Sequence, residues 1–169
     1  MHPCIAPLAA IYDLNTDLLL NCLDGISDAE AGQRLAAGGN SMLFLAAHLA
    51  DSRHFLAARL GHAAENPMAA YLDKARGIED IAAWPPLADV RAAWVAVSDH
   101  LIGVLDGLSS EELAATNAHR FPVSDTSRLG MIAFLTQHDS YHLGQLAFLR
   151  RQLGRPAMAY TRRTSTASP

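Results

Sequence analysis

The stretch SRLGMIAFLTQHDSYHLGQLAFLRRQLGRP, residues 127 to 156, contains the clearest helix signal of the chain. Ser127 is a suitable N-cap, and Gly154 followed by Pro156 is a typical stop signal. Apolar residues recur between them at helical spacing, which predicts one long helix over about residues 127–153. At about 100° per residue, one stripe of this helix gathers apolar side chains, two imidazoles and an amide. The stripe consists of Met131, Phe134, Leu135, His138, His142, Gln145 and Leu149.

The same periodicity predicts three further long helices. We expect them over residues 5–23, 41–60 and 87–105. Capping boxes at residues 27–30 (SDAE) and 109–112 (SSEE) predict short helical turns between the long helices. Residues 65–86 are expected to form a connection with at most one short helix. Since nothing reads as a good strand, the sequence predicts an all-α fold, a four-helix bundle.

Length and composition indicate one globular domain. The chain has 169 residues, of which 50% are hydrophobic and 18% are charged, a composition that can bury a sizeable core. We expect the domain to comprise residues 1–158 and a polar, flexible tail to follow over residues 159–169. The net charge of −4, with no basic block before the last ten residues, argues against nucleic acid as a partner.

The sequence also indicates where the protein works. Its N-terminus lacks the pattern of a signal peptide, and no apolar run reaches the length of a membrane span, so we expect no membrane partner. Cys4 and Cys22 form no CxxC motif and are expected to lie too far apart for an easy disulfide. Reduced thiols fit a reducing compartment. We therefore expect a cytoplasmic protein.

Two of the eight histidines stand out, while most of the others can be explained as solvated or locally hydrogen-bonded rings. His138 and His142 are four residues apart, so they stack on one face of a helix and can bind one ion, with Zn–N bonds of about 2.0–2.1 Å. The alternative is two core histidines, each bonded to a carbonyl or a carboxylate. His48, on the flank of the helix over residues 41–60, is the candidate for a third ligand. Three histidines would leave coordination positions open, as in catalytic sites.

The segments around these histidines resemble the DinB-like family, also called the YfiT-like metalloenzymes. The matching residues are GNS at 39–41, AHLAD at 47–51 and HDSYHLGQL at 138–146, and the resemblance covers about residues 5–156. It implies a four-helix bundle with up-down-down-up connections. It also implies a divalent metal ion held by three histidines, which by position are His48, His138 and His142.

The resemblance further suggests a reaction. Relatives within the fold include thiol S-transferases that use low-molecular-weight thiols such as bacillithiol or glutathione, and a mycothiol-dependent isomerase shares the domain. We therefore expect a metal-dependent enzyme in which zinc, nickel or iron activates such a thiol for S-transfer to an electrophile. A hydrolase that uses metal-bound water, or a non-catalytic, stress-associated metal-binding dimer, are the alternatives. A small-molecule substrate and a homodimer are the expected partners; the substrate, the metal and the thiol stay open.

Several residues near the histidines are candidates for supporting roles. Tyr141 and Gln145 are candidate catalytic residues that could hydrogen-bond a ligand or the substrate. Tyr141 could equally pack with its hydroxyl at the surface, and Gln145 could equally bond to backbone. Asp51 and Asp139 could orient an imidazole, since ligating histidines usually donate their second N–H. For Asp139 a solvated charge is the preferred interpretation, as it is for Arg150 near the end of its helix.

Overall fold

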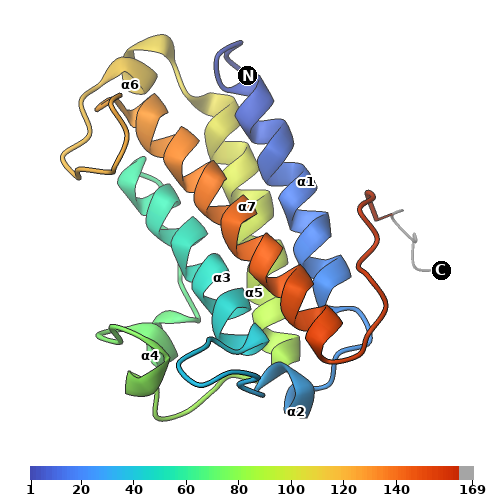
Figure 1. The fold of residues 1–169 in the computed structure, drawn as a ribbon. Coiled ribbons are helices and arrows are strands. Elements are labelled where there is room, and N and C mark those ends of the chain that lie inside the picture. Colours follow the sequence, from blue (N-terminus) through green and yellow to red (C-terminus); the bar gives the residue numbers. More distant parts are fainter. Residues whose placement is uncertain (164–169) are drawn as a thin grey trace.

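The computed structural model describes residues 1–163, and the chain folds there into four long helices joined by shorter elements (Figure 1). The long helices are α1 (Ala6–Leu23), α3 (Met42–Arg59), α5 (Leu87–Gly107) and α7 (Arg128–Gln152). The short elements are α2 (Asp28–Ala31), α4 (Ala69–Leu72), the 3-10 helix η1 (Ile78–Asp80) and α6 (Ser110–Ala114). Residues 1–163 form no β-strand, and their β-type pairing is limited to an isolated antiparallel bridge between Thr116 and Ser127. The predicted all-α fold is confirmed.

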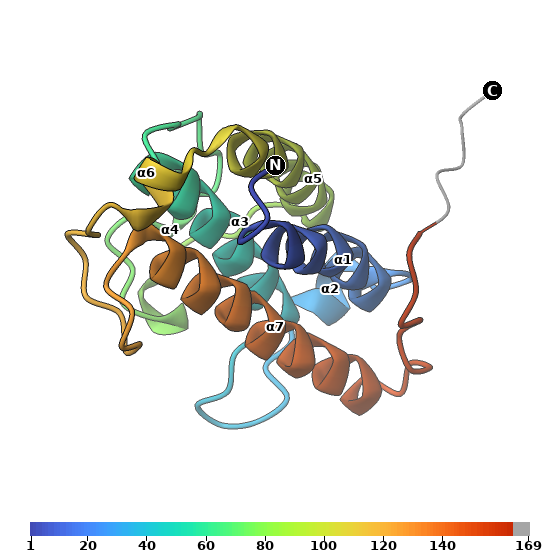
Figure 2. The same cartoon turned by 90° about the horizontal axis from the view of Figure 1, so that it is seen from above.

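The long helices run up-down-down-up. In Figure 1, α1 and α7 descend from the end that carries α6, while α3 and α5 ascend from the end that carries α2. Each long helix packs against two others: α3 lies against α5 and α7, and α1 lies against the same two helices. Figure 2, the view from above, shows the resulting four-membered arrangement. The antiparallel pair α3 and α7 places His48 opposite the two histidines of α7.

Serine side chains cap the N-termini of four helices, α2, α3, α6 and α7. Ser27 and Ser109 each open a capping box, in which the serine hydroxyl accepts from the third backbone N–H and the glutamate there reaches back. Ser41 and Ser127 cap α3 and α7 in the same way with their hydroxyls. Gly154 follows α7 with φ of 73°, a left-handed conformation that suits glycine.

The core is divided along the bundle axis into two apolar halves. One half gathers buried side chains around Trp94 and Leu49, and the other gathers side chains around Leu56 and Leu101. Buried polar residues from all four long helices lie at intermediate positions between the halves. They are Asn15, Ser52, Arg53, His54, Ser98, Thr136 and Asp139.

The described part of the C-terminal segment lies along α1. The Asn21 side-chain amide donates to the carbonyl oxygens of Ala159 and Thr161, and Arg162 forms an ion pair with Asp13. The rest of the expected tail, residues 164–169, lies outside the described residues. Among residues 1–163, no helix combines the length and the apolar character that crossing a bilayer requires.

Candidate metal centre

Three imidazoles meet between α3 and α7. His138 Nε2 lies 3.1 Å from His48 Nε2 and 3.1 Å from His142 Nε2. All three ligand atoms lie within 4.8 Å of one another, and the three residues are partly buried. Two nitrogens that bind one ion at about 2.1 Å can be at most about 4.2 Å apart, so the two contacts that His138 makes suit ligands of a single ion. The structure thus brings together all three histidines predicted from the sequence, and their role as ligands stays a prediction.

Local geometry explains how the two helices present these rings. His138 and His142 are one turn apart on α7, with ring centroids 4.5 Å apart. On α3, Phe44 lies one turn before His48 and stacks on its ring, with centroids 5.8 Å apart and planes 3° from parallel. Trp84 packs edge-on against Phe44 from the segment before α5. This aromatic stack holds the His48 ring on its outer side.

Burial favours the neutral form of two of the three rings, His138 and His48. Burial, together with the neighbouring His142 and His48 rings, lowers the pKa of His138 to about 4. Burial also lowers the pKa of His48, with His142 acting in the same direction and Asp51 opposing it. The neutral imidazole is the form that binds metals, because the lone pair must be free. The environment therefore favours the ligating form of both rings.

Gln145 sets the tautomer of His142. The Gln145 Oε1 atom lies 2.6 Å from His142 Nδ1. An amide oxygen can only accept, so Nδ1 carries the hydrogen and the Nε2 lone pair faces the cluster. Such a contact is typical of the residues that orient metal-binding histidines. Both further candidates contact the cluster: Gln145 through this hydrogen bond, and Tyr141, 57% exposed, through its ring, which packs edge-on against the His142 ring with centroids 5.1 Å apart.

The surroundings of His138 argue against an ordinary core histidine. Among the described residues its buried Nδ1 has no hydrogen-bond partner, and its Nε2 contacts imidazole nitrogens rather than a carbonyl or a carboxylate. His138 Nε2 can carry at most one hydrogen, so it can donate a hydrogen bond to only one of the two neighbouring nitrogens, His48 Nε2 or His142 Nε2. The other nitrogen then faces His138 without a hydrogen bond from it. A cation among the three Nε2 atoms would satisfy all of them, so the donor set fits a metal ion.

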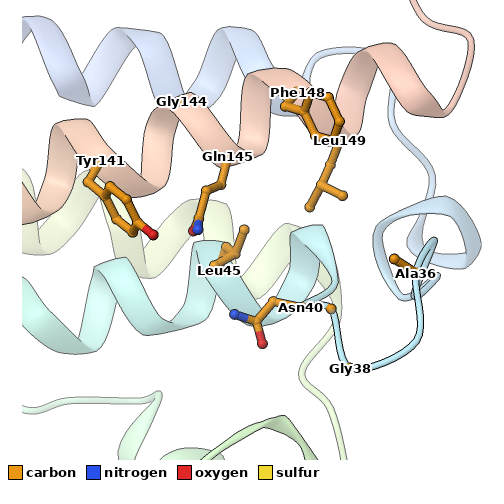
Figure 3. Close-up of a pocket in the computed structure, with 10 residues that line it drawn as sticks. Ala36, Gly38, Asn40, Leu45, Tyr141, Gly144, Gln145, Phe148 and Leu149 are labelled. Carbon is orange, nitrogen blue, oxygen red and sulfur yellow. The ribbon is translucent and has the colours of Figure 1, made fainter.

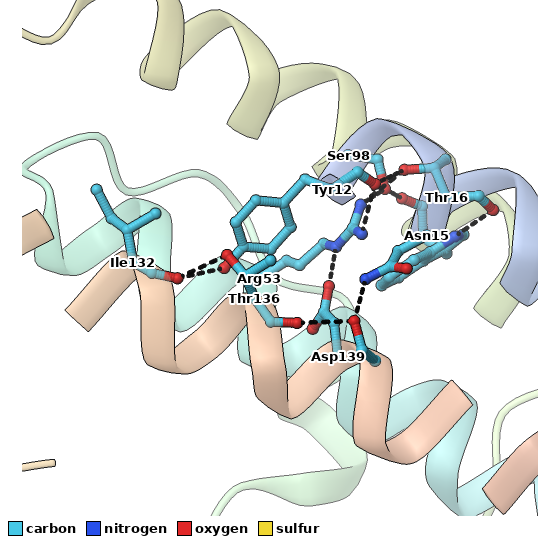
Figure 4. Close-up of polar contacts among 10 residues, drawn as sticks. Tyr12, Asn15, Thr16, Arg53, Ser98, Ile132, Thr136 and Asp139 are labelled. Atoms are coloured by element: carbon cyan, nitrogen blue, oxygen red, sulfur yellow. Dashed lines mark hydrogen bonds and ion pairs between the residues drawn. The ribbon is translucent and has the colours of Figure 1, made fainter. Parts of the chain in front are cut away.

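A buried ion pair that the sequence did not predict lies beside the cluster. Arg53 Nε donates to Asp139 Oδ2 at 2.9 Å, and both side chains are only 1% exposed (Figure 4). The remaining guanidinium nitrogens of Arg53 donate to Thr16 Oγ1, Ser98 Oγ and the Tyr12 carbonyl. The interpretation of Asp139 as a solvated charge was wrong, because its side of α7 faces Arg53 in the core.

This ion pair joins all four long helices at the level of the cluster. The Arg53 guanidinium lies 3.7 Å from the centroid of the Trp94 ring on α5, a cation–π contact. Burial raises the pKa of Asp139 to about 6, although Arg53 opposes the rise. Arg53 follows His48 by five residues on α3, and Asp139 follows His138 directly on α7. The pair therefore holds together the same two helices that present the histidines.

Two other polar residues are buried, whereas the sequence favoured a solvated or locally hydrogen-bonded ring for His54 and a solvated charge for Arg150. His54 is 7% exposed, and neither ring nitrogen has a hydrogen-bond partner among residues 1–163. Arg150 is 8% exposed, because it donates to the carbonyl oxygens of Cys22, Asp24 and Pro156 and so ties the end of α7 to the end of α1. Asp51 was a candidate for orienting an imidazole, but within residues 1–163 it forms no hydrogen bond with a histidine of the cluster. Its carboxylate instead accepts a hydrogen bond from the Asn66 side-chain amide.

A pocket of about 550 Å³ lies next to the cluster (Figure 3). It opens between α3, α7 and the loop that precedes α3, and Gln145 belongs to both the pocket wall and the cluster. The lining residues are Ala36, Gly38, Gly39, Asn40, Leu45, Tyr141, Gly144, Gln145, Phe148 and Leu149. Its volume suits a small molecule.

Fold and site together define a class of helical bundle in which three histidines from two helices form a group able to hold a metal ion. The chain belongs to the DinB superfamily, whose family model matches residues 11–146. The fold is similar to the crystal structure of a DinB-like protein, YjoA, from Bacillus subtilis, with 16% sequence identity and a TM-score of 0.63. That similarity covers 96% of this chain and 100% of the other. A comparison with curated proteins found no significant match. The family predicted from the sequence is confirmed.

Proposed function

We propose that the protein is a metal-dependent enzyme in which His48, His138 and His142 hold one divalent ion. The observation that supports this proposal best is the convergence of three Nε2 atoms, with His138 at 3.1 Å from each of the other two. Imidazole ligands suit zinc, nickel and iron. Three protein ligands leave room for water or a substrate, as in catalytic rather than structural zinc sites.

The proposed reaction is the transfer of a low-molecular-weight thiol to an electrophile. A divalent ion at this site would supply Lewis acidity, which lets a thiol or a water ionise near neutral pH. The thiol proton passes to solvent, the sulfur forms a bond to the electrophilic carbon, and the leaving group departs with the electron pair of the broken bond. Within the protein, Gln145 holds the hydrogen of His142 on Nδ1, and the pocket beside it receives the small molecule.

One feature of the pocket favours S-transfer over hydrolysis. Metalloproteases with an HExxH motif use a glutamate as general base beside the metal-bound water. Among the described residues, the pocket lining offers Asn40, Tyr141 and Gln145 as polar side chains and no carboxylate. A thiolate that is formed at the metal site needs no such base for its attack. We therefore prefer the thiol reaction to the hydrolase alternative.

Metal analysis tests the ligand set. Protein expressed in unsupplemented medium should contain about one divalent ion per chain, and variants His48→Ala, His138→Ala and His142→Ala should lose it. His119→Ala, in an exposed loop, is the matched control and should keep the ion. Equal metal content in all four variants would reject the proposed site. Titration of the chelated protein with cobalt provides a second measurement, because the visible absorption of cobalt reports its ligands.

Activity measurements test the reaction. Chlorodinitrobenzene is offered together with glutathione, bacillithiol or cysteine, and nitrophenyl acetate is offered without a thiol. We expect thioether formation that depends on the thiol and disappears in His138→Ala. Ester cleavage without any thiol-dependent product would instead favour the hydrolase. Full metal occupancy without either reaction across a broad panel would favour a non-catalytic metal-binding protein.

A further inference from the structure

The pocket beside the histidine cluster has an uncharged wall. Its polar side chains are the amides of Asn40 and Gln145 and the Tyr141 hydroxyl, and within residues 1–163 the lining includes no Asp, Glu, Lys or Arg. In the adjoining depression Arg34 pairs with Glu79 at 2.6 Å, so its charge is already compensated. A charged ligand would lose hydration in the pocket without gaining a partner of opposite charge.

Large aromatic side chains border the pocket and stay open to solvent. Tyr141 and Phe148 are 57% and 62% exposed, and they lie two turns apart on α7. Figure 3 shows the Tyr141, Gln145 and Leu149 side chains extending from α7 toward the side of Leu45 and Asn40. Clustered exposed apolar residues around a hollow are typical of binding sites.

Gly144 leaves space in this pocket that protein packing does not explain. It lies in the interior of α7, where glycine destabilises a helix relative to alanine. A Cβ atom at Gly144 would meet nothing within 4 Å. At Gly130 on the same helix, by contrast, a Cβ would lie 2.2 Å from the Asp125 carbonyl oxygen, so packing requires that glycine. A side chain at position 144 would project from the pocket wall, into space open to a ligand.

We propose that this pocket binds an uncharged molecule with a flat, largely apolar group and that it discriminates against charged molecules of the same shape. The side-chain amide of Gln145, already fixed by its contact with His142, and that of Asn40 offer hydrogen bonds to a carbonyl or nitro group. Leu45 lines the pocket and lies one helical turn before His48 on α3, so a molecule bound there lies beside the histidine cluster. In the S-transfer reaction this molecule would be the electrophile, an assignment that rests on the proposed function. The charged thiol would then approach from outside this pocket.

Three probes of equal shape test the charge selectivity: benzamide is neutral, benzoate is an anion and benzamidinium is a cation. Binding to the chelated, metal-free full-length protein is followed by amide NMR shifts along residues 141–149. We expect benzamide to bind with a Kd of about 1–10 mM and both charged probes to bind at least about fivefold more weakly. Equal or tighter binding of either charged probe, or no benzamide shifts at about 50 mM, would overturn the proposal.

Filling the pocket tests its location. Gly144→Leu should weaken benzamide binding at least about tenfold. Gly103→Leu is the matched control, because Gly103 lies inside α5, has open space at its Cβ and does not line this pocket; it should bind like the wild type. Unchanged affinity in Gly144→Leu would place the site elsewhere. If that variant does not fold by circular dichroism, Phe148→Ala removes an exposed pocket side chain and should weaken binding about threefold; unchanged affinity there would also reject the site.

The two proposals fail separately. Benzamide binding in the metal-free protein does not require the histidine ligands, whereas metal content does not require the pocket. Normal benzamide selectivity together with equal metal content in the histidine variants would reject the metal site and keep the pocket. Full metal loss in those variants with equal binding of all three probes would reject the pocket assignment alone.

Discussion

Replacing Arg53 by methionine should strongly destabilise the bundle. The change leaves the Asp139 carboxyl, 1% exposed, without the guanidinium that lies 2.9 Å away. Removing one partner of a buried ion pair costs about 3–5 kcal/mol. For a domain of this size each kcal/mol shifts the melting temperature by about 2–4 °C. We therefore expect the Tm to fall by about 6–20 °C.

The stability lost in Arg53→Met should depend on pH, because it depends on whether the Asp139 carboxyl is ionised. Burial raises the pKa of Asp139 to about 6 in the folded protein, and removing Arg53, which lowers it, must raise the pKa further. A group whose folded pKa lies above its unfolded value stabilises the fold at low pH and loses that contribution as the pH rises through the folded pKa. The deficit of Arg53→Met should therefore be largest near pH 8 and smaller near pH 5, where the carboxyl is protonated in both proteins.

Thermal and urea unfolding of the chelated protein, followed by circular dichroism, measure this deficit without a contribution from bound metal. Arg162→Met is the matched control, because Arg162 pairs with Asp13 at the surface and both side chains are more than half exposed. An exposed pair contributes at most about 1 kcal/mol. A Tm decrease below about 3 °C in Arg53→Met, or a deficit independent of pH, would refute the reasoning.

Three further predictions concern other parts of the molecule. Gln145→Leu should weaken metal binding about 10–100-fold in a cobalt titration, because the histidine it contacts loses its acceptor. A chromogenic disulfide should react quickly with exposed Cys4, while Cys22, whose pKa burial raises to about 12, should react only after unfolding. Gly144→Ala should raise the Tm by about 1–4 °C, because alanine favours a helix by about 0.5–1 kcal/mol, whereas Gly130→Ala should lower it, because its Cβ would clash.

Each of these predictions has a result that contradicts it. Gln145→Glu keeps an acceptor oxygen and should bind metal much like the wild type; equal losses in the Glu and Leu variants would disprove an acceptor role. Two fast thiols in the native protein would show that Cys22 is accessible. A lower Tm for Gly144→Ala would mean that the helix contacts something at this position that the structure does not contain.

The sequence predicted helices better than it predicted polar contacts. The four long helices begin and end within two residues of the expected bounds, because caps and stop signals act within one turn. His138 and His142 were recognisable for the same reason, since HxxxH places both rings on one helical face. His48 lies 90 residues before His138. Its place on the flank of its helix made it a candidate, and the resemblance to a known family selected it over the other five histidines.

Arg53 and Asp139 show why the sequence did not predict the buried polar contacts. Arg53 lies four residues after the buried Leu49 on the inner face of α3, and that position was the available signal. Asp139 alone looks like a solvated charge, since nothing within four residues of it on α7 is a cation. Their pairing spans 86 residues and depends on how two helices are rotated about their axes.

By itself, the sequence determined the all-α class, the helix bounds, the caps and the family, because each depends on residues that are neighbours along the chain. The tertiary structure alone decided that Gln145 holds the His142 ring, that Asp139 is buried against Arg53 and that an uncharged pocket opens beside the cluster. Those features depend on the packing of α3 against α7, where a rotation of either helix by one residue would turn a core contact toward solvent.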